Sequence, residues 1–230
     1  MSAAILEVIV CSVADAIEAQ HGGASRLELV QNLEQGGLTP SFELVREIRD
    51  KVDLPLRVMV RESVGYDAQN EYEIEKLCLA ANAFDSLRVD GLVLGYLNGG
   101  EVDVALCERI LSHAPHSKAT FHHAFEDAKD QLRALKAIKR LPQVHRVLSH
   151  GGSGSLIEKI GRFQKYQDVA APEIEIIAGG GIDLNAITQI GRTTSIREFH
   201  VGRAVRNPPR VHGFVKAELV SKLVGVLREL

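Results

Sequence analysis

Eight times along this chain, a short segment of β-type residues is followed by a segment with helical periodicity. Strands that alternate with helices form βαβ units and a parallel sheet. Eight such units in 230 residues is the number that closes a (β/α)8 barrel. The sequence therefore predicts an α/β protein with one TIM-type barrel domain over residues 1–230, whose chemistry lies at the carboxyl ends of the strands. The expected strands begin near Ile5, Arg26, Pro55, Asp90, Lys118, Val144, Glu173 and Glu198.

Composition and charge exclude several classes of protein. The net charge is −3, both signs are interspersed, and no basic stripe is present, so we expect no nucleic-acid partner. No apolar run approaches the roughly 20 residues of a membrane span, so we expect no membrane partner either. The first residues lack the basic region of a signal peptide and are interpreted as a strand. Three widely spaced cysteines argue against a disulfide framework and favour a cytoplasmic protein.

The alternation of side chains along each strand predicts a charged barrel interior. The outward face of a barrel strand packs on helices and must be apolar, whereas the next residue points inward. In the segment RLELV, Leu27 and Leu29 face the helices, so Arg26 and Glu28 face the interior. The same argument on the other strands gives the full inward set, which is Glu7, Arg26, Glu28, Arg57, Arg61, His122 and His200.

Two interpretations of this interior stay open, because buried charges are costly unless they are paired. The deeper members, Glu7, Arg26 and Arg57, are expected to form a structural ion-pair network. Glu28, Arg61, His122 and His200 lie nearer the catalytic face and are the candidate catalytic residues. His122 could act as a general acid or base, because the unperturbed pKa of histidine lies near neutrality, although a histidine that only bonds to a carboxylate is the simpler alternative.

Glycine-rich segments follow the last two strands. Barrels often bind phosphate at these loops, where glycines let backbone N–H groups approach an anion. We therefore expect an anion site at Gly180, Gly181, Gly202 and Arg203, with the arginine adding a charge-assisted contact. The alternative is that the glycines serve only as tight turns.

Metal ligands are sparse in this sequence. Cys78 and Cys107 fall in helical segments, which leaves Cys11 as the cysteine expected at the barrel mouth. His122 and His123 are expected on opposite faces of a strand, where they would not share an ion. Because Cu(I) prefers thiolate and thioether ligands, Cys11 and Met59 are the candidates for copper.

Several segments resemble the copper homeostasis protein CutC family, over about Leu6 to Val205. They are LEVIVCSVADAIEAQHGGASRLELVQNLEQGGLTPS, TFHHAFED, RVLSHGG and IIAGGGI. The resemblance implies a cytoplasmic barrel, a homo-oligomer with a dimer favoured, and a role in copper homeostasis or copper binding. It also places Glu7, Arg26, Glu28, Arg61, His122 and His200 at family positions in the barrel mouth. The chain departs from the family after Arg61, where ESVGYD replaces PRGGDF, and after His122, where a histidine replaces arginine.

Three functions follow from these observations. The first is a CutC-like protein that binds or traffics copper. The second is an enzyme that acts on a small phosphorylated or anionic metabolite, with His122 and Glu28 as acid–base groups. The third is a barrel that has lost its activity and serves as a scaffold.

Overall fold

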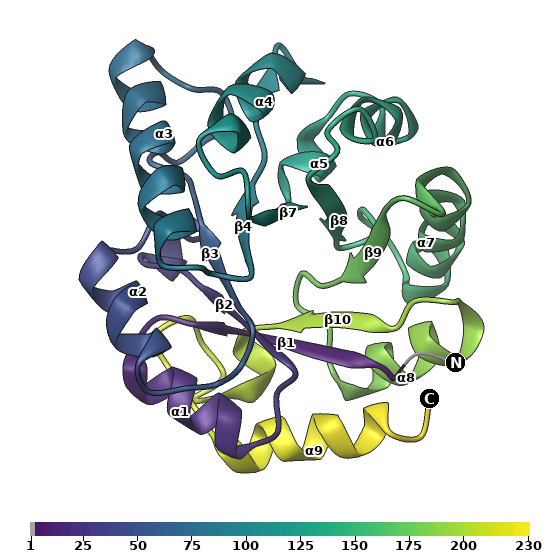
Figure 1. Cartoon of the computed structure of the whole chain (residues 1–230). Helices are drawn as coiled ribbons and strands as arrows, with labels where there is room; N and C mark the ends of the chain where they lie inside the picture. Colours follow the sequence, from purple (N-terminus) through teal and green to yellow (C-terminus); the bar gives the residue numbers. More distant parts are fainter. Residues whose placement is uncertain (1–2) are drawn as a thin grey trace.

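The computed structural model describes residues 3–230 and contains a closed barrel of eight parallel strands with helices outside it (Figure 1). The predicted (β/α)8 architecture is therefore confirmed. Around the barrel each strand pairs with its neighbour in the chain, and the last closes on the first. The strands are β1 (Ile5–Val10), β2 (Arg26–Leu29), β3 (Leu56–Met59), β4 (Gly91–Leu94), β7 (Lys118–Phe121), β8 (Val144–Ser149), β9 (Glu175–Ala178) and β10 (Glu198–Val201).

The helices cover the outside of the barrel, as Figure 1 shows. Several begin at serines whose hydroxyl accepts a backbone hydrogen bond, as Ser12 does from Asp15 and Ser41 from Leu44. The helices are α1 (Val13–His21), α2 (Phe42–Arg49), α3 (Glu71–Ser86), α4 (Val104–Ser112), α5 (Ala124–Asp127), α6 (Gln131–Ile138), α7 (Leu156–Ala170), α8 (Leu184–Thr193) and α9 (Ala217–Leu227). No helix within residues 3–230 is long and apolar enough to cross a membrane.

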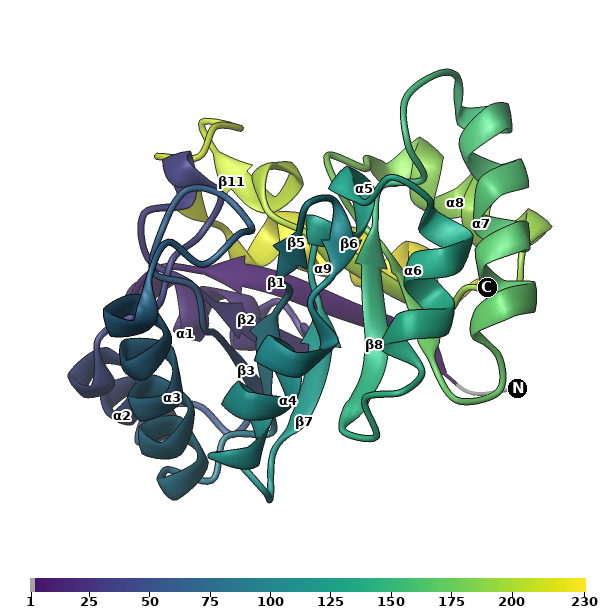
Figure 2. The same ribbon diagram turned by 90° about the horizontal axis from the view of Figure 1, so that it is seen from above.

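Short elements decorate one end of the barrel (Figure 2). Two antiparallel hairpins are formed by β5 (Leu97–Asn98) with β6 (Glu101–Val102), and by β11 (Arg206–Asn207) with β12 (Phe214–Val215). Single 3-10 turns occur at η1 (Leu33–Gln35) and η2 (Arg203–Val205). Figure 2 shows β5, β6, β11 and α5 at the same end, beyond the carboxyl ends of the strands.

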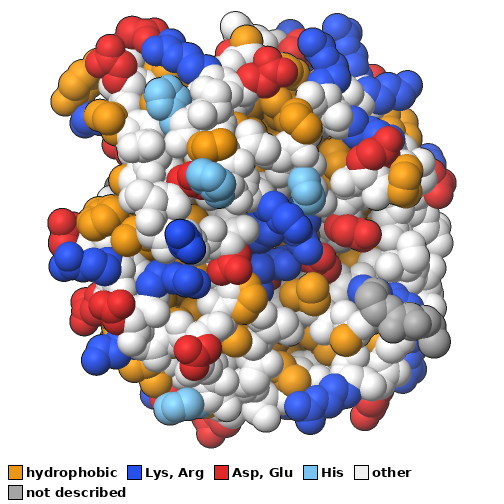
Figure 3. Space-filling model, in the orientation of Figure 1, with side chains coloured by type: hydrophobic (Ala, Val, Ile, Leu, Met, Phe, Trp, Pro, Cys, Tyr) orange, Lys and Arg blue, Asp and Glu red, His pale blue; other side chains and the backbone are white. Residues whose placement is uncertain are grey.

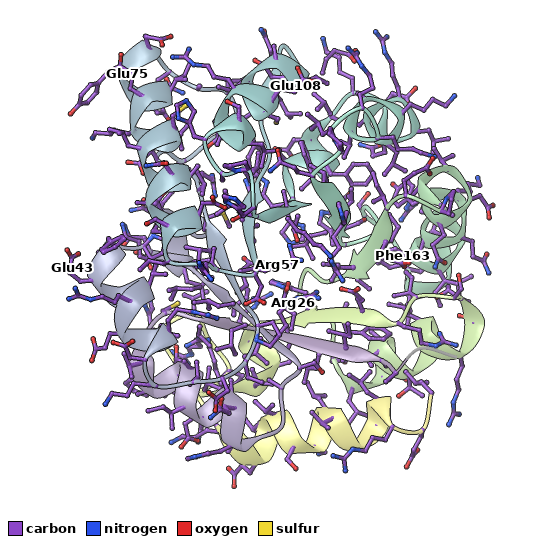
Figure 4. All side chains as sticks on the ribbon, viewed as in Figure 1. Arg26, Glu43, Arg57, Glu75, Glu108 and Phe163 are labelled. Carbon is purple, nitrogen blue, oxygen red and sulfur yellow. The ribbon has the colours of Figure 1, made fainter. Side chains whose placement is uncertain are left out.

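The apolar core lies between the strands and the helices. Leu27, Leu29, Val58 and Phe199 are fully buried on the outward faces of their strands, which confirms the register inferred from the sequence. The interior of the barrel is instead polar. Figure 4 shows Arg26 and Arg57 near the centre of the ring of strands. Figure 3 shows Lys and Arg side chains gathered over the same central region of the face turned to the viewer.

An ion-pair network fills the deeper interior, as the sequence predicts. Arg26 donates to Glu7 through Nε and to Glu198 through Nη2, at 2.6 Å in the second case. Arg146 donates to the same Glu198 carboxylate at 2.7 Å. Arg57 donates a hydrogen bond to a neutral group, from Nη1 to Thr120 Oγ1 at 3.1 Å. The inward set predicted from the sequence lacks Arg146 and Glu198, although both occupy inward positions of β8 and β10.

Gly91 makes room for this network. A Cβ atom at Gly91 would lie 2.6 Å from Arg57 Nη1 and 2.6 Å from the Lys118 carbonyl oxygen. Both separations are too short for a carbon atom, and the carbonyl belongs to the neighbouring strand β7. The glycine is therefore needed where the Arg57 guanidinium crosses β4.

Candidate functional site in the barrel mouth

A cavity of about 200 Å³ lies at the carboxyl ends of the strands. The structure brings together there all four residues singled out as catalytic candidates, Glu28, Arg61, His122 and His200. Apolar side chains form much of the remaining wall. The other lining residues are Ile9, Val30, Leu33, Gly36, Met59, Tyr66, His123 and Leu148.

Glu28 faces the cavity as a buried carboxyl group without a hydrogen bond to its Oε2 atom. The side chain is 3% exposed. Burial raises the pKa of Glu28 to about 7; the cation at His200 opposes this rise, and the carboxylate of Glu7 adds to it. A carboxyl group that is half ionised near neutral pH can both take up and release a proton, which suits a general acid or base.

His200 lies between two carboxylates. Its Nδ1 atom is 2.8 Å from Glu7 Oε1 and 3.6 Å from Glu28 Oε2. Burial lowers the pKa of His200, but the carboxylates of Glu28 and Glu7 outweigh it and hold the pKa above its ordinary value. Glu7 is itself ionised: burial raises its pKa, yet Arg26 and His200 together hold it far below the usual range. Charge on Glu7 therefore favours the imidazolium of His200.

His122 is held as a neutral imidazole. The backbone N–H of Ala124 donates to His122 Nδ1 at 3.2 Å, so this nitrogen carries the lone pair and the proton is assigned to Nε2. Burial, and then the positive charge of Arg61, hold the pKa of His122 well below its ordinary value. The Nε2 atom is buried and has no hydrogen-bond partner. His122 thus presents a donor N–H with no acceptor.

Arg61 supplies a positive charge that no carboxylate balances nearby. Its Nε donates to the Gly65 carbonyl and its Nη1 to the Gly37 carbonyl, both at 3.2 Å. The guanidinium carbon lies 4.9 Å from the centre of the Tyr66 ring. Within residues 3–230, no carboxylate lies within salt-bridge distance of Arg61. Carbonyl dipoles and an aromatic face therefore hold the arginine, and its charge remains for an anionic ligand.

The expectation that His122 and His123 face opposite ways was wrong. Strand β7 ends at Phe121, and His123 has helical backbone angles at the start of α5, with φ −59° and ψ −9°. The alternation of strand side chains no longer applies there, so both histidines line the cavity. Burial lowers the pKa of His123 to about 3, and its Nδ1 atom has no partner. The sequence reading also missed Tyr66, whose position depends on the loop after β3.

Cys11 lies at the same end of the barrel, but outside the residues that line the cavity. Strand β1 ends at Val10, and the N–H of Cys11, in the turn before α1, donates to the carboxylate of Asp15 in that helix. The side chain borders a neighbouring hollow of about 290 Å³, with its Sγ 3.8 Å from Arg206 Nη2. Burial raises the pKa of the Cys11 thiol to about 11, so the thiol is protonated at neutral pH. Cys11 therefore lies near the barrel mouth, as expected, but its side chain does not line the cavity.

The glycine loops after β9 and β10 lie side by side, as the anion-site prediction requires. A Cβ atom at Gly181 would lie 3.1 Å from Arg203 Nη2. Gly180 and Gly181 have φ values of +74° and +83°, a conformation that glycine adopts readily. Gly202 immediately precedes η2. None of these four residues lines the cavity, so the expected anion site is separate from it, and its role in binding stays a prediction.

One group of potential metal ligands occurs among residues 3–230. Ligand atoms of Glu7, Glu28 and His200 lie within 4.8 Å of one another. Glu7 and His200 already bind each other, and Glu7 also accepts from Arg26. The group offers oxygen and imidazole donors and no sulfur, whereas Cu(I) prefers sulfur. The donor set therefore fits Cu(I) poorly.

Comparisons with known proteins identify relatives over most of the chain. The CutC family model matches residues 4–205. A family protein CutC of Xylella fastidiosa is 35% identical over 196 residues, which are 85% of this chain and 73% of that protein. The human protein named copper homeostasis protein cutC homolog is 32% identical over 197 residues, 85% of this chain and 72% of that protein.

Solved structures of similar fold include a CutC protein and an enzyme of another family. The structure of a CutC protein from Streptococcus agalactiae has a TM-score of 0.78 and 26% identity, and the match covers 90% of this chain and 99% of that chain. A phosphoribosylanthranilate isomerase from Thermotoga maritima has a TM-score of 0.64 and 13% identity, over 99% of this chain and 100% of that chain. At that identity the likeness extends to the barrel fold alone.

Proposed function

The chain belongs to the CutC family, and from its barrel mouth we propose that it is an enzyme that performs acid–base chemistry on a small anionic metabolite. One observation carries this proposal. Two buried polar atoms that have no hydrogen-bond partner among residues 3–230, Glu28 Oε2 and His122 Nε2, belong to residues that line one cavity together with Arg61. An unpartnered buried polar atom costs about 1–3 kcal/mol, and a ligand that bonds to these atoms would offset that cost.

The charged residues of the barrel mouth take different parts in this function. Arg61 binds the negative charge of the ligand. Glu28 exchanges a proton with it, because its pKa of about 7 allows both protonation states near neutral pH. Glu7 acts through His200, whose positive charge it maintains at 2.8 Å. The expected anion site at Gly180, Gly181, Gly202 and Arg203 lies outside the cavity lining, but Gly202 packs against Ile9 of the cavity wall. It would hold the phosphate of a phosphorylated ligand that extends beyond the cavity.

The test compares ligand binding in variants of two arginines. Arg61→Met keeps most of the apolar stem and removes the charge, whereas Arg109→Met alters an exposed arginine of α4 paired with Glu71. The probes are pyruvate, inorganic phosphate and a panel of sugar phosphates. Their binding is measured by ligand-observed NMR and by the thermal shift of the protein. At least one probe should bind the wild type and Arg109→Met, and bind Arg61→Met about 10-fold or more weakly, as expected for a hydrogen bond to a charged group. Equal binding to all three proteins would contradict the proposal.

Copper homeostasis is the second candidate function, favoured by the names of the relatives. We propose that this cellular role extends to the present chain, in the cytoplasm and as a homodimer, as the family resemblance implies. The group of Glu7, Glu28 and His200 suits Cu(I) poorly, whereas Met59 lines the cavity and Cys11 is the thiol nearest to the mouth, so direct contact with Cu(I) is assigned to Cys11. Thiol-dependent, stoichiometric Cu(I) uptake would support direct binding.

A further inference from the structure

His122 is fixed as a hydrogen-bond donor and is unsuited to be a base. Its Nδ1 lone pair accepts from the Ala124 N–H, and its Nε2–H has no acceptor in the part of the chain that the structure describes. Gly95 permits this placement, because a Cβ atom there would lie 2.7 Å from His122 Nδ1. A preorganised neutral imidazole N–H at a buried position can stabilise an oxyanion that forms on a carbonyl oxygen.

Glu28 is then the base of the site. The charged groups that act on it come from four strands: Glu7 on β1, Arg26 on β2, Arg57 on β3 and His200 on β10. Among the other titratable residues of the cavity, His200 is committed to Glu7, and burial keeps His122 and His123 neutral. Only Glu28 combines an unpartnered atom with a pKa near neutrality.

The size and walls of the cavity restrict the substrate. A volume of about 200 Å³ holds roughly six or seven waters at about 30 Å³ each, or a short organic molecule. The apolar wall formed by Ile9, Val30, Met59 and Leu148 suits a short hydrocarbon. Arg61 suits a carboxylate, and the His122 Nε2–H suits a carbonyl oxygen beside it.

We infer that the barrel mouth enolises a small 2-oxo carboxylic acid, with Arg61 on the carboxylate, His122 on the carbonyl oxygen and Glu28 as the base. The inference deepens the proposed function and rests on it. The bond between C3 and its hydrogen breaks, and the proton passes to a carboxylate oxygen of Glu28. The bonding pair forms the C2–C3 double bond, while the C2–O π pair moves to the oxygen. The resulting enolate oxygen accepts from His122, and proton return from Glu28 restores the acid.

Hydrogen–deuterium exchange tests this step directly. Pyruvate and 2-oxobutyrate are incubated with the protein in D2O with little buffer, and loss of the C3 proton signal is followed by NMR. Wild type should accelerate the loss above the rate without protein, increasingly as pH rises through about 7, because Glu28 must be ionised. Glu28→Gln should return the rate to background, and His122→Phe should lower it at least about 100-fold, the effect of removing an oxyanion donor. Glu71→Gln, on the outer helix α3, should match wild type.

Two outcomes separate this inference from the proposed function. If pyruvate binds in an Arg61-dependent way but neither acid exchanges, the enolisation is overturned and the ligand site stands. If neither acid binds nor exchanges, the enolisation is overturned, and the panel of phosphates decides the proposed function separately. A further measurement needs no variant: ¹H–¹⁵N correlation of the wild-type histidines should show His122 neutral and protonated on Nε2. Protonation on Nδ1 or a cationic His122 would also overturn the inference.

Discussion

Glu28→Gln should stabilise the protein above neutral pH. The same substitution at Glu7, the other carboxyl group beside His200, should destabilise it. Glu28 is buried without a hydrogen bond to Oε2, and its pKa rises from 4.5 to about 7 in the folded state. At about 1.4 kcal/mol per pKa unit, ionising Glu28 in the folded protein costs on the order of 3 kcal/mol. Glutamine resembles the protonated form and avoids that cost.

The pH dependence of this gain has a definite sign. Because the folded-state pKa of Glu28 lies above the unfolded value, the wild type loses stability as pH rises from about 4.5 through about 7. The advantage of Glu28→Gln should therefore be absent below about pH 4.5 and largest above about pH 7. The measurement is urea unfolding, followed by circular dichroism, at a series of pH values.

Glu7→Gln has the opposite sign because Glu7 is paired. It accepts from Arg26 and lies 2.8 Å from His200, and removing one partner of a buried ion pair costs about 3–5 kcal/mol. The folded-state pKa of Glu7 is depressed, so its contribution is present above about pH 4.5 and is lost as pH falls through the folded pKa. Glu71→Gln is the exposed control, expected to unfold at the same urea concentration as wild type. If Glu28→Gln were as destabilised as Glu7→Gln at about pH 8, the reasoning on Glu28 would be refuted.

Three further outcomes are expected. Arg203→Ala should weaken binding of inorganic phosphate or a sugar phosphate by about 1.5–3 kcal/mol in calorimetry, with unfolding unchanged; if the wild type binds none of these at millimolar concentration, the glycines serve only as turns. Cys11→Ser should weaken Cu(I) binding in a competition titration while Cys78→Ser does not, and equal affinities would exclude Cys11 as a ligand. Gly91→Ala should lower the free energy of unfolding by about 1–3 kcal/mol, because its Cβ would press on Arg57 and the Lys118 carbonyl; a urea midpoint equal to wild type would show that the network yields there.

Much of the candidate site follows from local sequence pattern. Because side chains alternate along a strand and the outward face must be apolar, Leu27 and Leu29 place Glu28 inside the barrel without any knowledge of other strands. Phe199 places His200 in the same way, and the parallel direction of all eight strands brings their carboxyl ends together. The sequence pattern therefore predicts both the fold and the convergence of Glu28, Arg61, His122 and His200.

Only the tertiary structure determines the positions of residues beyond the strand ends, where the alternation of side chains no longer applies. Beyond the last residue of a strand, the backbone leaves the extended conformation and side chains no longer alternate between two faces. For this reason His123 lines the cavity and Cys11 does not. Tyr66 reaches the site from a loop, where no periodic pattern applies.

The chemistry of the site also depends on distances that the sequence does not encode locally. Glu7 and His200 are 193 residues apart in the chain and 2.8 Å apart in space. Two inward carboxyl groups on neighbouring strands therefore differ in charge. Glu7 is ionised because Arg26 and His200 reach it, whereas the pKa of Glu28, one inward position higher, lies near neutrality because burial outweighs its more distant cation. Residue pattern determined which groups face the barrel interior, and the closing of β10 on β1 determined which of them carry charge.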